Sequence, residues 1–256
     1  LCGGLALLYG VCLRDQPSSA PQNAADKRDM ISWWCSMMVV LRQPQTWCLG
    51  GYAFLVWAPI SIFAVLWGIS FLHTTYLVTE TRAAVWLSAV WIGVALGGPC
   101  LGWLLACLNR RCLPMVLGGI LGAGASMVLV YQPGLPPVAL IMVLFVMGVA
   151  SSAQAISFAA VFDRQPAHLL GVASGFNNMT VVMGGFICQP IVGVILKSHA
   201  LSRGSTVHAE YFLSDYQSAL WLLPVCYLCS SLVAAMAVKE TFCQPCAVDM
   251  QSPGVN

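Results

Sequence analysis

The 256-residue chain is too apolar for a soluble protein of its length. Hydrophobic residues make up 59% of it and Asp, Glu, Lys and Arg only 8%, whereas a soluble domain carries about 25% charged residues. The mean hydropathy is +0.82, and the net charge of +2 is too small to indicate binding of nucleic acid. The composition therefore predicts a polytopic membrane protein that is embedded in the lipid bilayer and has no nucleic-acid partner.

The charged residues leave six long uncharged segments, and each segment predicts one membrane-spanning helix. A spanning helix needs about 20 apolar residues. Barrel strands would alternate polar and apolar side chains over about 10 residues, and these continuous apolar runs do not alternate. The sequence therefore predicts an all-α membrane protein, with a six-helix transmembrane bundle in residues 48–239 whose spans are 48–71, 85–107, 113–131, 138–161, 169–196 and 218–238.

The segments on either side of this bundle have different characters. Residues 1–13 are apolar but too short to span a membrane, and they lack the basic start and small-residue cleavage site of a signal peptide. We expect them to be the end of one preceding, truncated transmembrane helix. Residues 14–47 are expected to form a cytoplasmic central loop, in which the apolar stretch 30–41 predicts an interfacial helix. Residues 240–256 are expected to be a polar cytoplasmic tail without regular structure.

The basic residues indicate how the bundle is oriented. Cytoplasmic loops of membrane proteins carry an excess of Lys and Arg. If residues 14–47 are cytoplasmic, eight basic residues lie inside (Arg14, Lys27, Arg28, Arg42, Arg110, Arg111, Arg164 and Lys239) and three outside (Arg82, Lys197 and Arg203). This asymmetry predicts a multi-pass protein of the plasma membrane (the bacterial inner membrane) with a cytoplasmic C-terminus.

The titratable residues do not support an enzyme or a metal site. Cys226-x-x-Cys229 and Cys243-x-x-Cys246 have the spacing of a zinc site, but one pair lies in the last predicted span and the other in the tail. A single metal ion would have to be bound across the membrane boundary. The four histidines form no pair at helical spacing, and no Ser/His/Asp arrangement can be argued. We expect no catalytic residues, no metal, no cofactor and no structural disulfide.

A few polar and aromatic residues inside the spans are candidates for a solute pathway. Polar side chains at membrane depth usually face the bundle interior or a water-filled cavity. They can also simply hold helices together by hydrogen bonds, and the sequence alone leaves both interpretations open. The candidates are Gln154, Asn177, Asn178, Gln189, Trp57 and Trp67.

Glycines recur four residues apart in several of the predicted spans. Small residues at this spacing let two membrane helices approach closely. The pairs are Gly93/Gly97, Gly98/Gly102, Gly118/Gly122 and Gly171/Gly175, and Gly184-Gly185 continues the pattern. They predict close helix packing at each of these positions.

The segment 92–115, IGVALGGPCLGWLLACLNRRCLPM, resembles a conserved loop of the major facilitator superfamily. In that family the loop follows a G-x-x-x-D-…-R-R pattern and helps to latch a cytoplasmic gate. Gly102, Arg110 and Arg111 match this gate motif, whereas the acidic position is Ala106.

Two further segments resemble helices in the second half of bacterial members. Residues 42–72 are similar to the first helix of that half, although relatives are expected to carry an acidic residue near Val65. Residues 171–196, which contain Asn177-Asn178 and Gln189-Pro190, are similar to its penultimate helix.

The resemblance implies a secondary active transporter that moves a small organic solute by alternating access, with its site between two six-helix halves. The chain would be the C-terminal half, as a fragment truncated at the N-terminus, and its partner would be the missing N-terminal half of the same transporter. Whether a proton or a sodium ion is co-transported stays open. The alternative is a non-transporting or decayed membrane protein of the same fold, such as a scaffold or a receptor-like subunit, which the missing acids at Ala106 and Val65 favour.

Overall fold

The computed structural model describes residues 25–202 and 211–242. The expected helix end at 1–13, the basic residues Arg14 and Arg203, and the Cys243-x-x-Cys246 pair lie outside the described residues. The chain divides into two compact units, residues 1–36 and 37–256. Of the first unit the structure describes only the start of α2 (Ala25–Leu41), and the second unit contains the other described helices.

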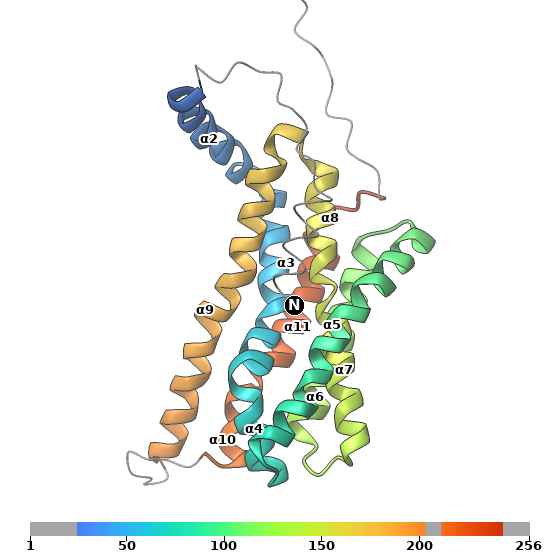
Figure 1. The fold of residues 1–256 in the computed structure, drawn as a ribbon. Coiled ribbons are helices and arrows are strands. Elements are labelled where there is room, and N and C mark those ends of the chain that lie inside the picture. Colours follow the sequence, from blue (N-terminus) through green and yellow to red (C-terminus); the bar gives the residue numbers. More distant parts are fainter. Residues whose placement is uncertain (1–24, 203–210, 243–256) are drawn as a thin grey trace, which may run out of the picture. The chain divides into compact units, whose positions relative to one another are not determined.

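Six helical spans, each long and apolar enough to cross a membrane, make up the second unit (Figure 1). Three are single helices: α5 (Glu80–Leu108), α6 (Cys112–Tyr131) and α9 (Leu170–Ser202). The other three are interrupted: α3 (Pro44–Ile60), the π-helix η2 (Ser61–Trp67) and α4 (Gly68–Tyr76) form the first span, α7 (Pro137–Ser151) and α8 (Gln154–Arg164) the fourth, and α10 (Leu213–Leu220) and α11 (Leu222–Met236) the sixth. A short 3₁₀ helix, η3 (Ala167–Leu169), precedes α9. No strand occurs in residues 25–202 or 211–242, and the predicted all-α membrane fold is confirmed.

Local signals, rather than charges, set the helix ends. Pro44 and Pro137 occupy the first turns of α3 and α7, where the missing proline N–H leaves no helical hydrogen bond unmade. The side chain of Thr79 accepts a hydrogen bond from the backbone N–H of Arg82 at 3.4 Å and so caps α5. Asn109, with φ 51°, ends the same helix in a left-handed turn.

The helices therefore continue past the charged residues at the ends of the uncharged segments. The fourth span continues to Arg164 and contains Asp163, and α9 continues through Lys197 to Ser202. A helix satisfies its own backbone hydrogen bonds in water as in lipid, so it does not have to end where the hydrocarbon ends.

Close glycine contacts hold α5 against α7 and α6 against α11. A Cβ atom on Gly93 would lie 2.2 Å from the carbonyl oxygen of Phe145, and one on Gly122 would lie 2.5 Å from the ring of Tyr227. Gly97, Gly118, Gly184 and Gly185 also face near neighbours, whereas Gly98, Gly102, Gly171 and Gly175 have nothing within 4 Å of such a Cβ. The prediction of close packing is thus wrong for two of the four pairs, and the reason is the direction in which each glycine faces.

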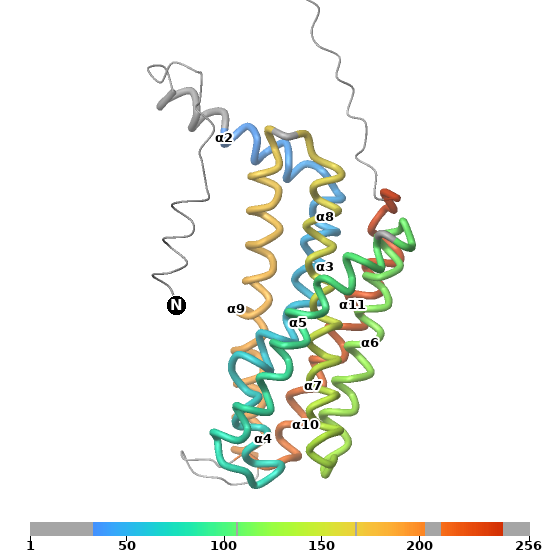
Figure 2. The backbone as a smooth tube through the Cα atoms, turned by 45° about the vertical axis from the view of Figure 1, so that its right-hand side comes forward, coloured from blue at the N-terminus to red at the C-terminus, as the bar shows by residue number. Residues whose placement is uncertain are grey.

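Burial is uneven among the six spans. The most apolar stretches of α5 and α9 are 33% and 28% buried, and those of the other four spans at least 50%. Figure 2 shows α9 along one side of the bundle and α5 running obliquely across the bundle. These two helices expose broad faces of the second unit to whatever surrounds it.

Candidate functional site

A polar cluster lies where α8 packs against α9, and it contains Asn177, one of the predicted pathway residues. Asn177 is 1% exposed, and its Nδ2 donates to Oγ of Ser157 at 2.9 Å. Ser157 in turn donates to the backbone carbonyl of Gln154 at 2.7 Å. The side chain of Gln154 is half-buried and makes no hydrogen bond within the described part of the chain.

Two buried side-chain atoms on this part of α9 have no hydrogen-bond partner among the described residues. They are Oδ1 of Asn177 and Oγ of Ser174, one turn earlier on α9. Buried polar atoms in proteins are nearly always paired with protein or water, and an unpaired one needs an explanation. A water molecule or a polar solute beside α9 would supply the missing hydrogen-bond partners, since water both donates and accepts.

The backbone is irregular at the same level. The fourth span is interrupted between Ser151 and Gln154, where the N–H groups of Ala153, Ala155 and Ile156 bond to carbonyls three residues earlier rather than four. Such 3₁₀ turns inside a helix often mark a hinge. Gln154 therefore stands at a point where the span can bend.

A second contact joins α9 to the π-helix of the first span. Nε2 of Gln189 donates to the carbonyl oxygen of Ser61 at 2.6 Å, at the start of η2. A π-helical turn inside an α-helix is rare and is frequent at functional sites. Gln189 lies 12 positions after Asn177, which is about 18 Å along a helix, so the two amides belong to separate contacts on α9.

The aromatic candidates lie in this first span. Trp67 ends η2, its ring meets that of Tyr211 edge-on at a centroid distance of 6.4 Å, and its buried Nε1 has no partner among the described residues. Trp57 is half-buried and packs against the apolar core. Asn178 is exposed, so it lies on a different face of α9 from the buried Asn177. The structure thus separates Asn177 from its neighbour, a distinction that the sequence did not make.

A charged cluster lies at the end of the bundle where α5 leads into α6. The guanidinium of Arg111 pairs with the carboxylate of Asp163 at the end of α8, with Nη2 3.0 Å from Oδ1. Oδ2 of Asp163 also accepts a hydrogen bond from Thr241 at 2.9 Å. Both charged side chains are largely buried, at 13% and 9% exposure, and the pair ties the α5–α6 turn to the fourth span.

Glu240 belongs to the same cluster, although the sequence placed it in a free tail. Its carboxylate accepts hydrogen bonds from the backbone N–H groups of Arg111 at 2.7 Å and Cys112 at 2.9 Å, at the start of α6. A carboxylate at a helix N-terminus is stabilised by the helix dipole. Burial raises the pKa of Glu240, but these hydrogen bonds and one from Phe242 outweigh it, and the net pKa lies below the ordinary value.

The predicted gate residues do not behave as one group. Arg111 is engaged with Asp163 and Glu240, Arg110 is exposed, and Gly102 faces open space. Sequence reasoning missed Asp163 because it looked for the acid four residues after Gly102, at Ala106. The signal that could have found it is a lone carboxylate at the end of a span, which needs a cationic partner.

The described residues contain no group of three or more His, Cys, Asp or Glu side chains that could hold a metal ion. Cys226 lies within the packed part of α11. The strongest polar features of the second unit are therefore the α8–α9 cluster, the Gln189–Ser61 contact and the charged cluster.

Comparison with known proteins identifies the fold. The family model described as Major Facilitator Superfamily matches residues 1–188. The chain belongs to the Major Facilitator Superfamily. Members of this superfamily are membrane transporters and not enzymes, so the predicted family and the expectation of no enzyme are confirmed.

A solved member of the superfamily has a similar fold. It is the proton:xylose symporter XylE bound to 6-bromo-6-deoxy-D-glucose, with 17% sequence identity and a TM-score of 0.50. The match covers 80% of this chain and 43% of the symporter chain. The chain thus spans less than half the length of that transporter. A comparison with curated proteins gives no match.

Proposed function

We propose that this chain forms one six-helix half of a secondary active transporter that moves a small organic solute by alternating access. The observation that carries the proposal is the buried Oδ1 of Asn177, which, like Oγ of Ser174 three residues earlier on α9, has no hydrogen-bond partner among the described residues. An unsatisfied acceptor at membrane depth is costly, and a polar solute or its water would satisfy it. Gln154 supplies a further polar group at the bend of the fourth span.

The uneven burial supports a half rather than a whole transporter. α5 and α9 are the two least buried spans, and a second bundle, the N-terminal half, would cover part of the faces that they expose. Alternating access needs such a pair of bundles, which rock around a site near the midplane of the membrane. The π-helix η2, which Gln189 of α9 contacts, and the 3₁₀ turn at Gln154 would be points where this half bends. Trp57 and Trp67 would line the pathway beside them.

The distribution of charge supports an orientation with the charged cluster in the cytoplasm. Five of the described basic residues lie at that end of the bundle (Arg42, Arg110, Arg111, Arg164 and Lys239) and two at the other (Arg82 and Lys197). In this orientation Arg111, Asp163 and Glu240 form the cytoplasmic gate cluster of this half, and the C-terminus is cytoplasmic. The proposed location is the plasma membrane, which in bacteria is the inner membrane.

The test is uptake by the full-length transporter that contains this chain. Cells expressing it are offered a panel of labelled sugars, amino acids, peptides and organic acids, with and without a proton or sodium gradient. We expect saturable uptake of one class. Normal abundance in the membrane with no saturable uptake of any class would favour the alternative of a non-transporting scaffold or receptor-like protein.

A matched pair of variants tests the site itself. Asn177→Ala removes the buried amide, and Asn178→Ala makes the same change on the exposed neighbour. We expect uptake to fall at least tenfold in Asn177→Ala and to change less than twofold in Asn178→Ala, with equal abundance, because a lost hydrogen bond to a buried polar group costs about 1–3 kcal/mol. Equal effects of the two changes, or a loss of abundance that parallels the loss of uptake, would assign Asn177 a structural role only.

A further inference from the structure

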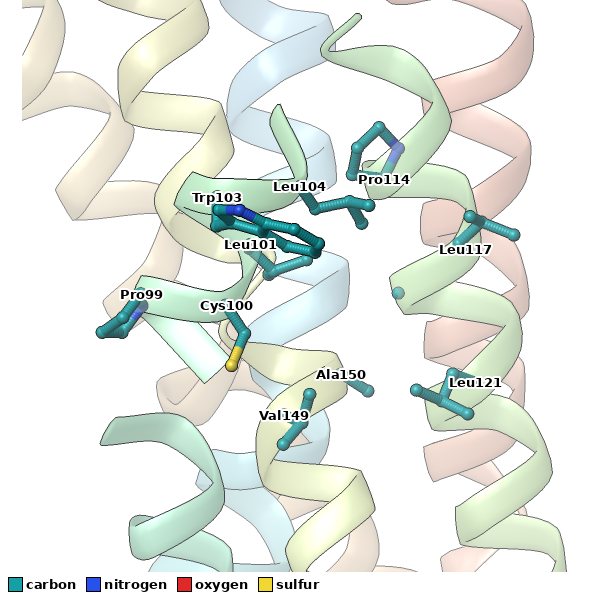
Figure 3. Close-up of a pocket in the computed structure, with 11 residues that line it drawn as sticks. Pro99, Cys100, Leu101, Trp103, Leu104, Pro114, Leu117, Leu121, Val149 and Ala150 are labelled. Atoms are coloured by element: carbon teal, nitrogen blue, oxygen red, sulfur yellow. The ribbon is translucent and has the colours of Figure 1, made fainter. Parts of the chain in front are cut away.

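An apolar groove opens between α5, α6 and α7, close to the charged cluster. Its volume is about 580 Å³. Figure 3 shows its walls, which include Leu101 and Trp103 of α5, Leu117 and Leu121 of α6, and Val149 of α7. None of the residues that line it is charged. Because no polar side chain converges on the groove, a polar solute has nothing to bind there.

Pro99 lies inside α5 and lines this groove. Up to Gly97, α5 lies tightly against the fourth span, because a Cβ on Gly97 would meet Ser152 at 2.3 Å. Gly98 and Gly102 face away from the other helices, with no neighbour within 4 Å of either Cβ position, while Leu101 still packs against the core. A proline inside a helix lacks the N–H for one hydrogen bond and displaces the preceding turn. The last turns of α5, which follow Pro99, contribute Leu101, Trp103 and Leu104 to one wall of the groove (Figure 3).

Two residues suit a phospholipid: Trp103, which lines the groove, and Arg110, which lies in the loop between the two helices that form its walls. Trp103 is 69% exposed, and tryptophan is the residue enriched at the level of the headgroups. The loop from Asn109 to Arg111 joins the two walls, α5 and α6, and Arg110 in it is exposed and forms no ion pair with a described residue. Arg111 beside it is occupied by Asp163. An anionic headgroup would therefore find its cation at Arg110.

We propose that the groove binds one acyl chain of an anionic phospholipid, whose headgroup phosphate is held by Arg110. The length of the groove favours a lipid over a second copy of the protein. Along α6 its lining extends from Pro114 to Leu121, which is about 10 Å of helix. A spanning helix of another copy would need contact along about 30 Å, whereas part of one acyl chain fits this length. The proposal does not depend on transport activity.

The experiment labels the bound lipid directly. The 256-residue chain is reconstituted into phosphatidylcholine vesicles that contain a minor fraction of phosphatidylglycerol with a photoreactive diazirine on its acyl chain. After irradiation we expect the label to be concentrated on residues 99–104 and 114–121. Cys100 lines the groove, so Cys100→Trp should fill it and reduce this labelling several-fold. Cys107→Trp, the same change at an exposed position of α5 outside the lining, should leave it unchanged.

The headgroup is tested by competition with unlabelled lipids. Unlabelled phosphatidylglycerol should compete better than phosphatidylcholine by about fivefold, the preference that one arginine gives for an anionic lipid. Arg110→Gln should abolish this preference, whereas Arg42→Gln, at another exposed arginine of the same end, should retain it.

Three results would overturn the proposal: label spread evenly over all exposed helices, equal labelling of the Cys100→Trp and Cys107→Trp variants, or chain-to-chain cross-links through Cys100 that show a second copy in the groove. If Cys100→Trp fails to fold by circular dichroism, Leu117→Trp at an exposed wall position makes the same comparison.

Discussion

Gly148 is the tightest contact between α5 and α7, and its replacement by alanine tests how this pair of helices is held. A Cβ at Gly148 would lie 2.0 Å from the carbonyl oxygen of Val90, and ordinary van der Waals contact begins at 3.4 Å. The obstacle is backbone, which cannot rotate away as a flexible side chain can. The two helices would have to move apart by about 1.4 Å along the contact direction, the difference between those two distances.

The magnitude follows from two opposing effects. Overpacking of a well-packed interior costs about 1–3 kcal/mol, and contact with rigid backbone places Gly148 at the upper end of that range. Alanine is favoured over glycine inside a helix by about 1 kcal/mol. We therefore expect Gly148→Ala to lower the free energy of unfolding by about 2 kcal/mol.

Gly124 provides the matched control. It lies inside α6, and nothing is within 4 Å of its Cβ position, so Gly124→Ala should be neutral or stabilise by up to about 1 kcal/mol. Reversible unfolding of the chain in mixed micelles with increasing dodecyl sulfate, followed by circular dichroism, measures both variants. Equal stability of Gly148→Ala and Gly124→Ala would refute the idea that backbone contact at Gly148 holds α5 and α7 together.

The remaining predictions concern the charged cluster, pH, topology and the isolated chain. Asp163→Asn should lower the stability by about 1.5–3 kcal/mol, the value of hydrogen bonds to a charged group, while Glu80→Gln, an exposed carboxylate, should change it by less than about 0.5 kcal/mol in the same unfolding titration. Because the pKa of Glu240 is lowered, its contribution to stability is complete above the ordinary glutamate pKa, about 4.3, and is lost as the pH falls through the lowered value. Thermal unfolding at a series of pH values should show this loss of stability. The Glu240→Gln variant should no longer show this dependence on pH. In a cysteine-free background, an impermeant maleimide added from outside should label a cysteine at position 82 and spare one at position 110; the opposite pattern would reverse the orientation. The reconstituted 256-residue chain should insert but show no saturable uptake, and uptake by a monomer would contradict the proposal of a half transporter.

The membrane fold could be predicted from the sequence because it depends on a long-range average. Twenty or so consecutive apolar residues specify a spanning helix whatever their neighbours are, and six such segments give the six-span bundle. Helix ends could not be predicted in the same way. The uncharged segment of the fourth span ends before Asp163. The helix itself continues through Asp163 to Arg164 and ends there, because Gln165 has an extended backbone.

The contacts between helices depend on rotation about each helix axis, which the sequence pattern does not fix. Gly97 and Gly98 are adjacent, yet only Gly97 meets another helix. Asn177 and Asn178 differ in the same way, since one is buried and the other exposed. The partner of Arg111 was also beyond local reasoning, because Asp163 lies 52 residues away and approaches only when the fourth span packs beside the α5–α6 turn.

The irregular and the regular parts of the bundle are distributed in a way that bears on the proposed mechanism. The π-helix and the 3₁₀ turn both occur in spans that α9 contacts through polar side chains: Gln189 of α9 bonds to the π-helix, and Asn177 of α9 bonds to Ser157 of α8. The pairs α5–α7 and α6–α11 are instead locked by glycine contacts, such as Gly122 against the ring of Tyr227. Packed interiors resist small displacements, so a change of shape in this half would be absorbed by the interrupted spans beside α9. A transporter that opens alternately to each side of the membrane needs both kinds of helix: pairs that stay tightly packed, and beside them helices with polar contacts that can bend.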